Sequence, residues 1–141
     1  MKKLYFLALF TVLAPLNAQV NLIPNGDFEA WTTGLPDSWY TTGSTVAQNT
    51  TIFHGGTSSL GLTSPASSNK TISPTTDTPV TQGVVYVFSG WYLDNDTTSR
   101  FKFWNQFRTA AGTGGADTGA NALQAASYST GSPSWQFFTA E

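Results

Sequence analysis

Cysteine is absent from this chain of 141 residues, histidine and methionine occur once each, and only 10% of the residues are charged. The absence of cysteine excludes thiol nucleophiles, cysteine-ligated zinc sites and iron–sulfur clusters. With His54 as the single imidazole, most zinc enzymes are excluded, and no Gly-x-Ser-x-Gly elbow supplies a serine nucleophile. The charged fraction is far below the roughly 25% of an ordinary soluble domain. Because helix surfaces need Glu, Lys, Arg and Leu, a helical bundle is not expected.

Threonine and serine are abundant instead, with 22 Thr and 14 Ser in the chain. Short apolar or alternating runs are separated by turn residues, a pattern typical of an all-β sandwich or barrel. No segment of the expected domain keeps a helical apolar period for three turns. We expect strands at 20–24, 27–31, 39–48, 58–63, 70–73, 78–80, 83–93, 100–108, 122–128 and 134–140. The Gly/Ala-rich stretch 110–122 is expected to form a loop.

The N-terminus has the pattern of a secretory signal. Two lysines precede the apolar stretch 4–13, which is too short to span a bilayer. Cleavage after Ala18 divides the chain into a signal peptide, 1–18, and one domain, 19–141; a retained membrane anchor is the alternative. The domain has four cations and eight anions, a net charge of −4. We therefore expect a mildly acidic protein that is secreted or held at the cell surface, with no membrane contact after cleavage.

Several short motifs occur in the same order as in a known family. They are NLIPNGDFE at 21–29, LPDSW at 35–39, HGGTSSL at 54–60, GVVYVFSGW at 83–91 and SWQ at 134–136. Together they resemble the carbohydrate-binding modules of the galactose-binding-like jelly-roll group, which accompany secreted glycanases and other surface enzymes. The resemblance extends over most of residues 21 to 141.

The resemblance implies a jelly roll of two antiparallel sheets and non-catalytic binding of a polysaccharide or other glycan. Family members close with a further strand, whereas this chain stops directly after the expected strand 134–140. We therefore expect a module without its closing strand, followed by a downstream domain of the same polypeptide, with any catalytic domain beyond residue 141. The family often holds one structural Ca²⁺, for which the matching carboxylate is Glu29, with carbonyl groups near Gly55 and Thr57.

The most informative segment is RFKFWNQFR, residues 100–108. Alternation along a strand puts Arg100, Lys102, Trp104, Gln106 and Arg108 on one face and Phe101, Phe103, Asn105 and Phe107 on the other. Tryptophan offers a flat surface to a sugar ring, while Gln, Arg and Lys donate hydrogen bonds to hydroxyl or carboxylate groups. The alternative is a solvated outer face, on which the long side chains cover the tryptophan.

The candidate ligand-binding residues are therefore Lys102, Trp104, Gln106 and Arg108, together with Trp91. The resemblance implies that Trp91 faces the concave side near Trp104, although the apolar run 83–93 is equally compatible with a core position. The cations between 100 and 108 favour an anionic or mixed glycan. Trp39, Phe53, Phe88 and Trp135 are expected in the core or at sheet edges, and Tyr40, Tyr92 and Tyr128 could rim a groove.

Two other functions stay open at this point. A structural or adhesive β-sandwich of a large cell-surface protein would have Trp91 and Trp104 packed inside. An accessory domain of an exported nuclease would use cations interleaved with aromatic residues. The net charge of −4 opposes the broad positive field that phosphate binding needs, so no nucleic-acid partner is expected. Asp27 and Glu29 are not a convincing glycosidase pair, because catalytic carboxylates usually flank a cleft from separate strands.

Overall fold

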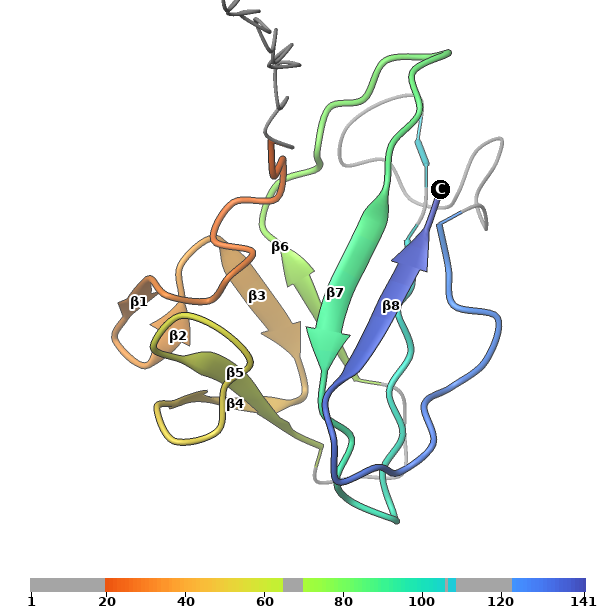
Figure 1. Ribbon diagram of the computed structural model, residues 1–141. Coiled ribbons are helices and arrows are strands. Elements are labelled where there is room, and N and C mark those ends of the chain that lie inside the picture. The colour runs from red at the N-terminus through yellow and green to blue at the C-terminus, as the bar shows by residue number, and fades with distance from the viewer. Residues whose placement is uncertain (1–19, 65–69, 106, 109–122) are drawn as a thin grey trace, which may run out of the picture.

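A computed structural model describes residues 20–64, 70–105, 107–108 and 123–141 (Figure 1). Within these ranges the chain is all-β, with no helix and hence none able to cross a membrane. The strands are β1 (Trp31–Thr32), β2 (Leu35–Pro36), β3 (Trp39–Thr42), β4 (Thr45–Asn49), β5 (Ser59–Thr63), β6 (Thr71–Pro74), β7 (Phe88–Tyr92) and β8 (Gln136–Ala140). They form four antiparallel pairs, β1–β2, β3–β6, β4–β5 and β7–β8. The expected signal peptide, 1–18, and loop, 110–122, lie outside the described residues.

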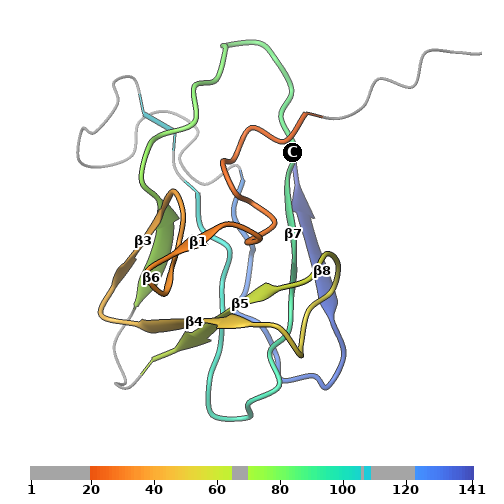
Figure 2. The same ribbon diagram turned by 90° about the vertical axis from the view of Figure 1, so that its left-hand side faces the viewer.

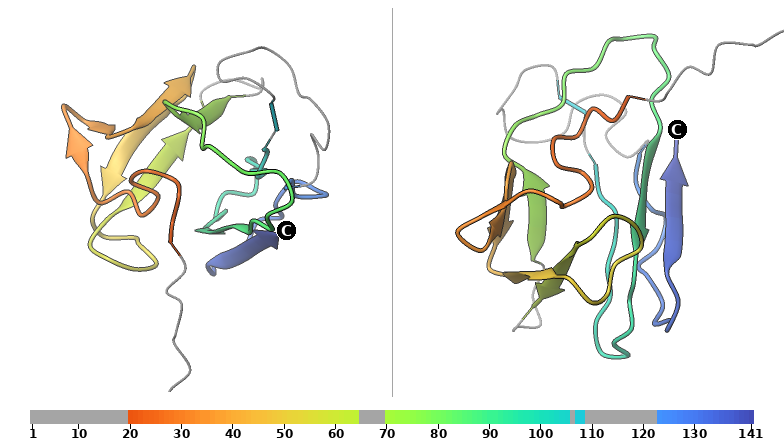
Figure 3. Two further views of the ribbon diagram at one scale, coloured as in Figure 1. Left: turned by 90° about the horizontal axis from the view of Figure 1, so that it is seen from above. Right: turned by 60° about the vertical axis from the view of Figure 1, so that its left-hand side comes forward.

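The strand pairs surround a common interior. Figure 2 shows β3–β6 on one side of the molecule and β7–β8 on the other, with β4–β5 crossing between them. The turned view in Figure 3 keeps the same separation, and the teal chain that follows β7 runs between the two pairs. The segment that carries the candidate binding residues therefore has the β7–β8 pair beside it.

The expected strands at 58–63, 70–73 and 134–140 are confirmed to within two residues as β5, β6 and β8. The expected strand 39–48 is two strands, because Gly43 adopts a φ of 68° and bends the chain. The expected strand 83–93 is shorter, and only Phe88–Tyr92 is paired.

The other strand predictions are wrong over the described residues. No strand occurs at 20–24 or 78–80, in the described parts of 100–108 and 122–128, or in 27–31 apart from Trp31. These segments contain the apolar residues that suggested strands, but their backbone groups form hydrogen bonds other than those of a regular sheet.

The motif at the start of the domain forms a folded turn in place of a strand. Asn25 has a φ of 48°, and its side-chain amide donates to the carbonyls of Ala30 and Asp37, both at 2.9 Å. Its Oδ1 accepts the Ala30 amide at 2.9 Å. The indole of Trp39 donates to the Asn25 carbonyl at 3.1 Å. Backbone groups that a strand would pair with a neighbour are thus satisfied by side chains, which is the usual reason for Asn in turns.

Irregular bonding also explains the missing strand between 100 and 108. Ala125 donates its amide to the Phe103 carbonyl at 3.0 Å, and Ser129 donates to the Phe101 carbonyl at 2.7 Å. The Phe101 amide donates to the Ser129 hydroxyl, at 2.6 Å, and not to a backbone carbonyl. The two segments lie side by side, but this side-chain bond interrupts the regular ladder of a sheet.

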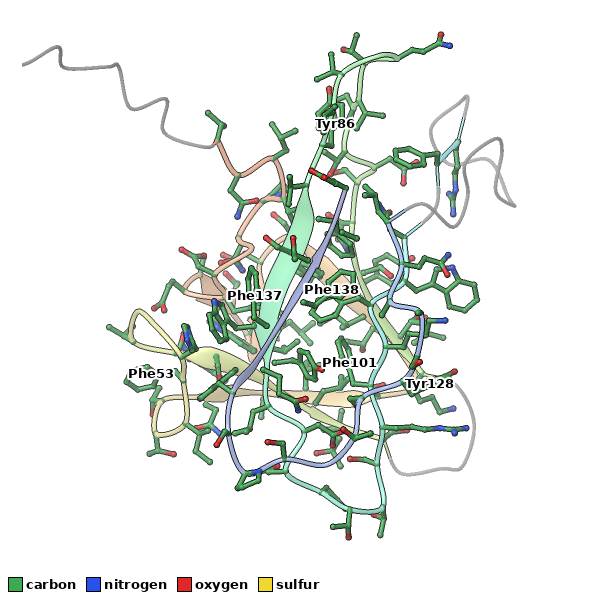
Figure 4. All side chains as sticks on the ribbon, turned by 45° about the vertical axis from the view of Figure 1, so that its right-hand side comes forward. Phe53, Tyr86, Phe101, Tyr128, Phe137 and Phe138 are labelled. Atoms are coloured by element: carbon green, nitrogen blue, oxygen red, sulfur yellow. The ribbon has the colours of Figure 1, made fainter. Side chains whose placement is uncertain are left out.

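Aromatic rings form the core between these segments. Phe103 stacks on Phe138 of β8, with ring centroids 4.5 Å apart and planes 8° apart. It also contacts Phe88 and Tyr92 of β7 edge to face, both at 5.7 Å. Phe101 packs at 4.9 Å from Phe103, and Figure 4 shows Phe101 and Phe138 toward the middle of the molecule. The expectation that Phe101 and Phe103 face the core is confirmed.

Gly90 lies close to the ring of Phe103 in this core. A Cβ atom at Gly90 would lie 3.1 Å from Cε1 and Cζ of Phe103, whose ring is held by its neighbours. We predict that Gly90→Ala lowers the free energy of unfolding by about 1–3 kcal/mol, the usual cost of overpacking a core. Urea denaturation followed by tryptophan fluorescence measures the effect.

Gly55→Ala is the matched control for this prediction. A Cβ atom at Gly55 would have nothing within 4 Å, so the same substitution should change stability by less than about 0.5 kcal/mol. Equal destabilisation by the two substitutions would show that the contact with Phe103 is not the cause.

Candidate functional site

The two faces of β7 have different surroundings. Gly90 faces the Phe103 ring, so Trp91, the next residue of the strand, points to the opposite face. There Trp91 stacks on His54 of the β4–β5 connection, with centroids 3.9 Å apart and planes 14° apart. Its ring is also 4.9 Å from Phe137 of β8. We call His54, Trp91 and Phe137 the Trp91 surface; its tryptophan is 49% exposed, with His54 lying on the indole.

A second surface is formed on the outer side of the segment that begins at residue 100. The Arg100 guanidinium lies 4.4 Å from the centroid of the Tyr128 ring, and the Lys102 ammonium lies 5.9 Å from it. Trp104 is 61% exposed, compared with 49% for Trp91. Because Phe101 and Phe103 face the core, Arg100, Lys102 and Trp104 share the outer side. We call these three residues and Tyr128 the Tyr128 surface.

These two surfaces lie on different sides of the molecule. In Figure 4, Phe137 and Tyr128 are on opposite sides of the ribbon, with Phe101 and Phe138 between them. Since Phe137 is the neighbour of Trp91, the structure does not bring Trp91 and Trp104 together. The expectation that Trp91 lies near Trp104 is therefore corrected, because alternation in two separately placed segments turns their tryptophans outward in opposite directions.

The other predicted ligand-binding residues do not all lie on one surface. Arg108 lies 4.0 Å from Asp77, at the limit of an ion pair, so this guanidinium has a carboxylate neighbour. Gln106 lies outside the described residues. Lys102 and Trp104 remain together, and Arg100, which alternation had already placed on their face, completes the surface.

Tyr128 belongs to this surface, although the sequence predicts for it only a possible place at the rim of a groove. It lies 26 positions or more from the cations that cover it, and no local pattern predicts that contact. Among the other aromatic expectations, Phe88 packs against Phe103. Phe53 lies in the connection between β4 and β5 and is 39% exposed, which corrects its assignment to the core or a sheet edge. Tyr92 packs on Phe103 and does not rim a groove.

Glu29, the predicted metal ligand, is engaged by hydrogen-bond donors. Its Oε1 accepts the amides of Thr57 at 2.8 Å and Ser58 at 3.1 Å, and its Oε2 accepts the Thr57 hydroxyl. The hydroxyl and then the amides of Thr57 and Ser58 lower the pKa of Glu29. Gly56, with a φ of 72°, brings the turn so close that a Cβ atom there would overlap the carboxylate.

The donor set around Glu29 is a poor fit for Ca²⁺, which takes oxygen ligands. The turn presents N–H groups to Oε1, where the prediction requires carbonyl oxygens. No group of three or more His, Asp or Glu side chains suited to a metal occurs in the part of the chain that the structure describes. Calcium at Glu29 stays a prediction.

Comparison with known proteins adds no relative. No family model, no curated protein and no solved structure matches this chain. The function therefore has to be inferred from the residues and surfaces described above.

The Glu29 contacts make a testable prediction about pH. Because the pKa of Glu29 is lower in the folded chain than in the unfolded one, its stabilising effect is complete above the ordinary glutamate pKa. It is lost as the pH falls through the lowered folded value. We predict that Thr57→Val moves the pKa of Glu29 upward, because the largest single cause of the shift is the Thr57 hydroxyl. A ¹³C NMR titration of the Glu29 carboxyl carbon measures it.

Thr45→Val is the control, since Thr45 is an exposed residue of β4 away from Glu29. It should leave the titration midpoint of Glu29 unchanged. An unchanged midpoint in Thr57→Val as well would contradict the assigned cause.

Proposed function

We propose that this chain is a non-catalytic carbohydrate-binding module and that its Tyr128 surface is the face that meets the glycan. The observation that carries the proposal is the exposure of Trp104, 61%, beside the hydrogen-bond donors Arg100 and Lys102. A large exposed aromatic ring next to charged donors suits a sugar, whose C–H face stacks on the ring while its hydroxyl groups accept hydrogen bonds.

Support for this face also comes from the rigidity of its base. Phe101 and Phe103, the neighbours that alternate with the outer residues, are packed in the aromatic core. A binding residue whose neighbours are held by packing loses little conformational freedom when a ligand binds. Trp104 is therefore presented on a supported segment.

The Trp91 surface is the weaker candidate for sugar stacking. His54 lies parallel to the indole of Trp91 at 3.9 Å, so one face of that ring is already occupied. Phe137 lies close to the same ring, at 4.9 Å. A pyranose would have to displace or avoid these neighbours, whereas no ring contact to Trp104 occurs among the described aromatic residues.

The same proposal includes the finer fold and the setting of the protein. The motif order and the two strand pairs on opposite sides of an aromatic core support a galactose-binding-like jelly roll. The N-terminal pattern supports export to the cell surface or the medium. There the module would anchor a secreted or surface enzyme to polysaccharide, and tethering would raise the effective concentration of that enzyme at its substrate.

Trp104→Ala tests the proposed binding face. We predict at least roughly tenfold weaker binding to any glycan that the protein binds, because an aromatic anchor at the centre of an interface commonly contributes more than about 1–2 kcal/mol. Affinity electrophoresis against a panel of neutral, uronic-acid and sulfated polysaccharides measures the loss, with tryptophan fluorescence as a second signal.

Trp91→Ala is the matched control, because it removes the same side chain from the other surface. Its affinity should stay within about twofold of the unmodified protein, given that remote sites act independently. Unchanged binding in Trp104→Ala, together with weaker binding in Trp91→Ala, would move the site to the Trp91 surface.

A structural or adhesive domain is the second candidate function. Its expectation that Trp91 and Trp104 are packed inside is not met, because they are 49% and 61% exposed. It is favoured instead by the exposed aromatic side chains on the outer face of β7–β8, where Phe137 is 53% exposed. Exposed apolar clusters of this kind often mark protein contacts. A folded protein that binds none of the polysaccharides in the panel would support this function over glycan binding.

A further inference from the structure

The cations of this chain are few, and two of them lie together on one aromatic ring. The expected domain, 19–141, has only four, Lys70, Arg100, Lys102 and Arg108, against eight carboxylates. Among the described residues, Arg108 is the one cation with a carboxylate at ion-pair distance, because it lies 4.0 Å from Asp77.

Arg100 and Lys102 have an aromatic partner in place of a carboxylate. Over the described residues, no carboxylate lies within 4.0 Å of either side chain, and both lie over Tyr128 within the range of cation–π contacts. Two like charges that share a ring repel each other, more strongly where the ring displaces water. An anion placed between them would relieve that repulsion.

From this arrangement we propose that Arg100 and Lys102 form an anion subsite, so that the glycan bound by this module is an acidic polysaccharide carrying carboxylate or sulfate groups. The proposal rests on the proposed function. Arginine presents two parallel N–H groups that match a carboxylate or a sulfate, and lysine adds a point charge beside them. Tyr128 lies under both side chains.

The position of Trp104 explains how one polymer would use the whole surface. Trp104 follows Lys102 by two residues on the same side, a separation of roughly 6–7 Å along an extended chain. One sugar ring can therefore stack on Trp104 while an acidic group of the same or the next residue meets the two cations. Neutral polysaccharides would keep the stacking contact and the weaker hydrogen bonds of their hydroxyl groups, but not the charge-assisted contact.

Nucleic acid is the competing anionic polymer, and the charge distribution opposes it. Single-stranded nucleic acid needs a groove that stays positive along several phosphates. Here two adjacent cations stand on a domain whose expected net charge is −4. The subsite fits isolated acidic groups that are spaced along a sugar chain.

The test compares charged polymers with their neutral counterparts. The probes are polygalacturonate against methyl-esterified pectin, for carboxylate, and dextran sulfate against dextran, for sulfate. The full chain, Trp104→Ala, and the double variant Arg100→Gln/Lys102→Gln are compared by affinity electrophoresis and calorimetry at low and high salt. Lys70→Gln is the charge control, because Lys70 lies against Gly43 at the β3–β4 turn and not at Tyr128.

We expect at least one charged probe to bind more tightly than its neutral counterpart, with affinity that falls as salt rises. The double variant should bind that charged probe roughly tenfold more weakly than the unmodified protein does, because two charge-assisted hydrogen bonds at an exposed site contribute about that much. It should lose clearly less affinity for the neutral probes, because hydrogen bonds to uncharged hydroxyl groups are weaker than charge-assisted ones and glutamine can still donate them. Lys70→Gln should behave as the unmodified protein. An unchanged urea midpoint shows that the double variant is folded.

Three results would overturn the anion subsite. Equal, Trp104-dependent binding of charged and neutral probes would leave the carbohydrate-binding module intact but remove the subsite. A double variant that loses no more affinity than Lys70→Gln would do the same. Tighter binding of a single-stranded oligonucleotide than of every polysaccharide, at the same salt, would assign the cations to nucleic acid. Failure to bind any polysaccharide contradicts the proposed function itself.

Discussion

Phe103 joins the interior of this protein to its outer face. Its ring stacks on Phe138 at 4.5 Å and lies against Gly90, and these contacts allow only one side of the segment to face inward. Alternation then turns Lys102 and Trp104 to the outside. A slip of one residue would bury the cation and expose the phenylalanines, so the packing that holds the core also determines the proposed binding surface.

The N-terminal motif has an architectural role in the same fold. Asn25 and Glu29, two polar residues of the stretch 21–29, both satisfy backbone amides or carbonyls of nearby turns. Asn25 holds the chain at a positive φ, and Glu29 holds the turn at Thr57. Motif residues of this kind support the scaffold, while the proposed recognition residues come from a segment outside the quoted motifs.

Charge and aromatic exposure together distinguish the two outer surfaces. At the Trp91 surface the indole is covered on one face by His54, and the neighbouring side chains are apolar. At the Tyr128 surface two cations share a ring beside an exposed indole. The Trp91 surface therefore resembles a packing contact in which the indole is still partly exposed. The Tyr128 surface combines a ring for stacking with positive charge, the two properties that suit an acidic sugar.

The sequence by itself determined the properties that depend on neighbouring residues. These are the all-β chain, the strands near 58–63 and 134–140, and the placement of Phe103 and Trp104 on opposite sides of their segment. Each follows from turn residues or from the two-residue period of an extended chain. Only the tertiary structure decided that Gly90 faces Phe103, which turns Trp91 and Trp104 in different directions, and that Tyr128 lies under Arg100. Those relations join segments far apart in the chain, and a local period cannot say which segment packs beside which.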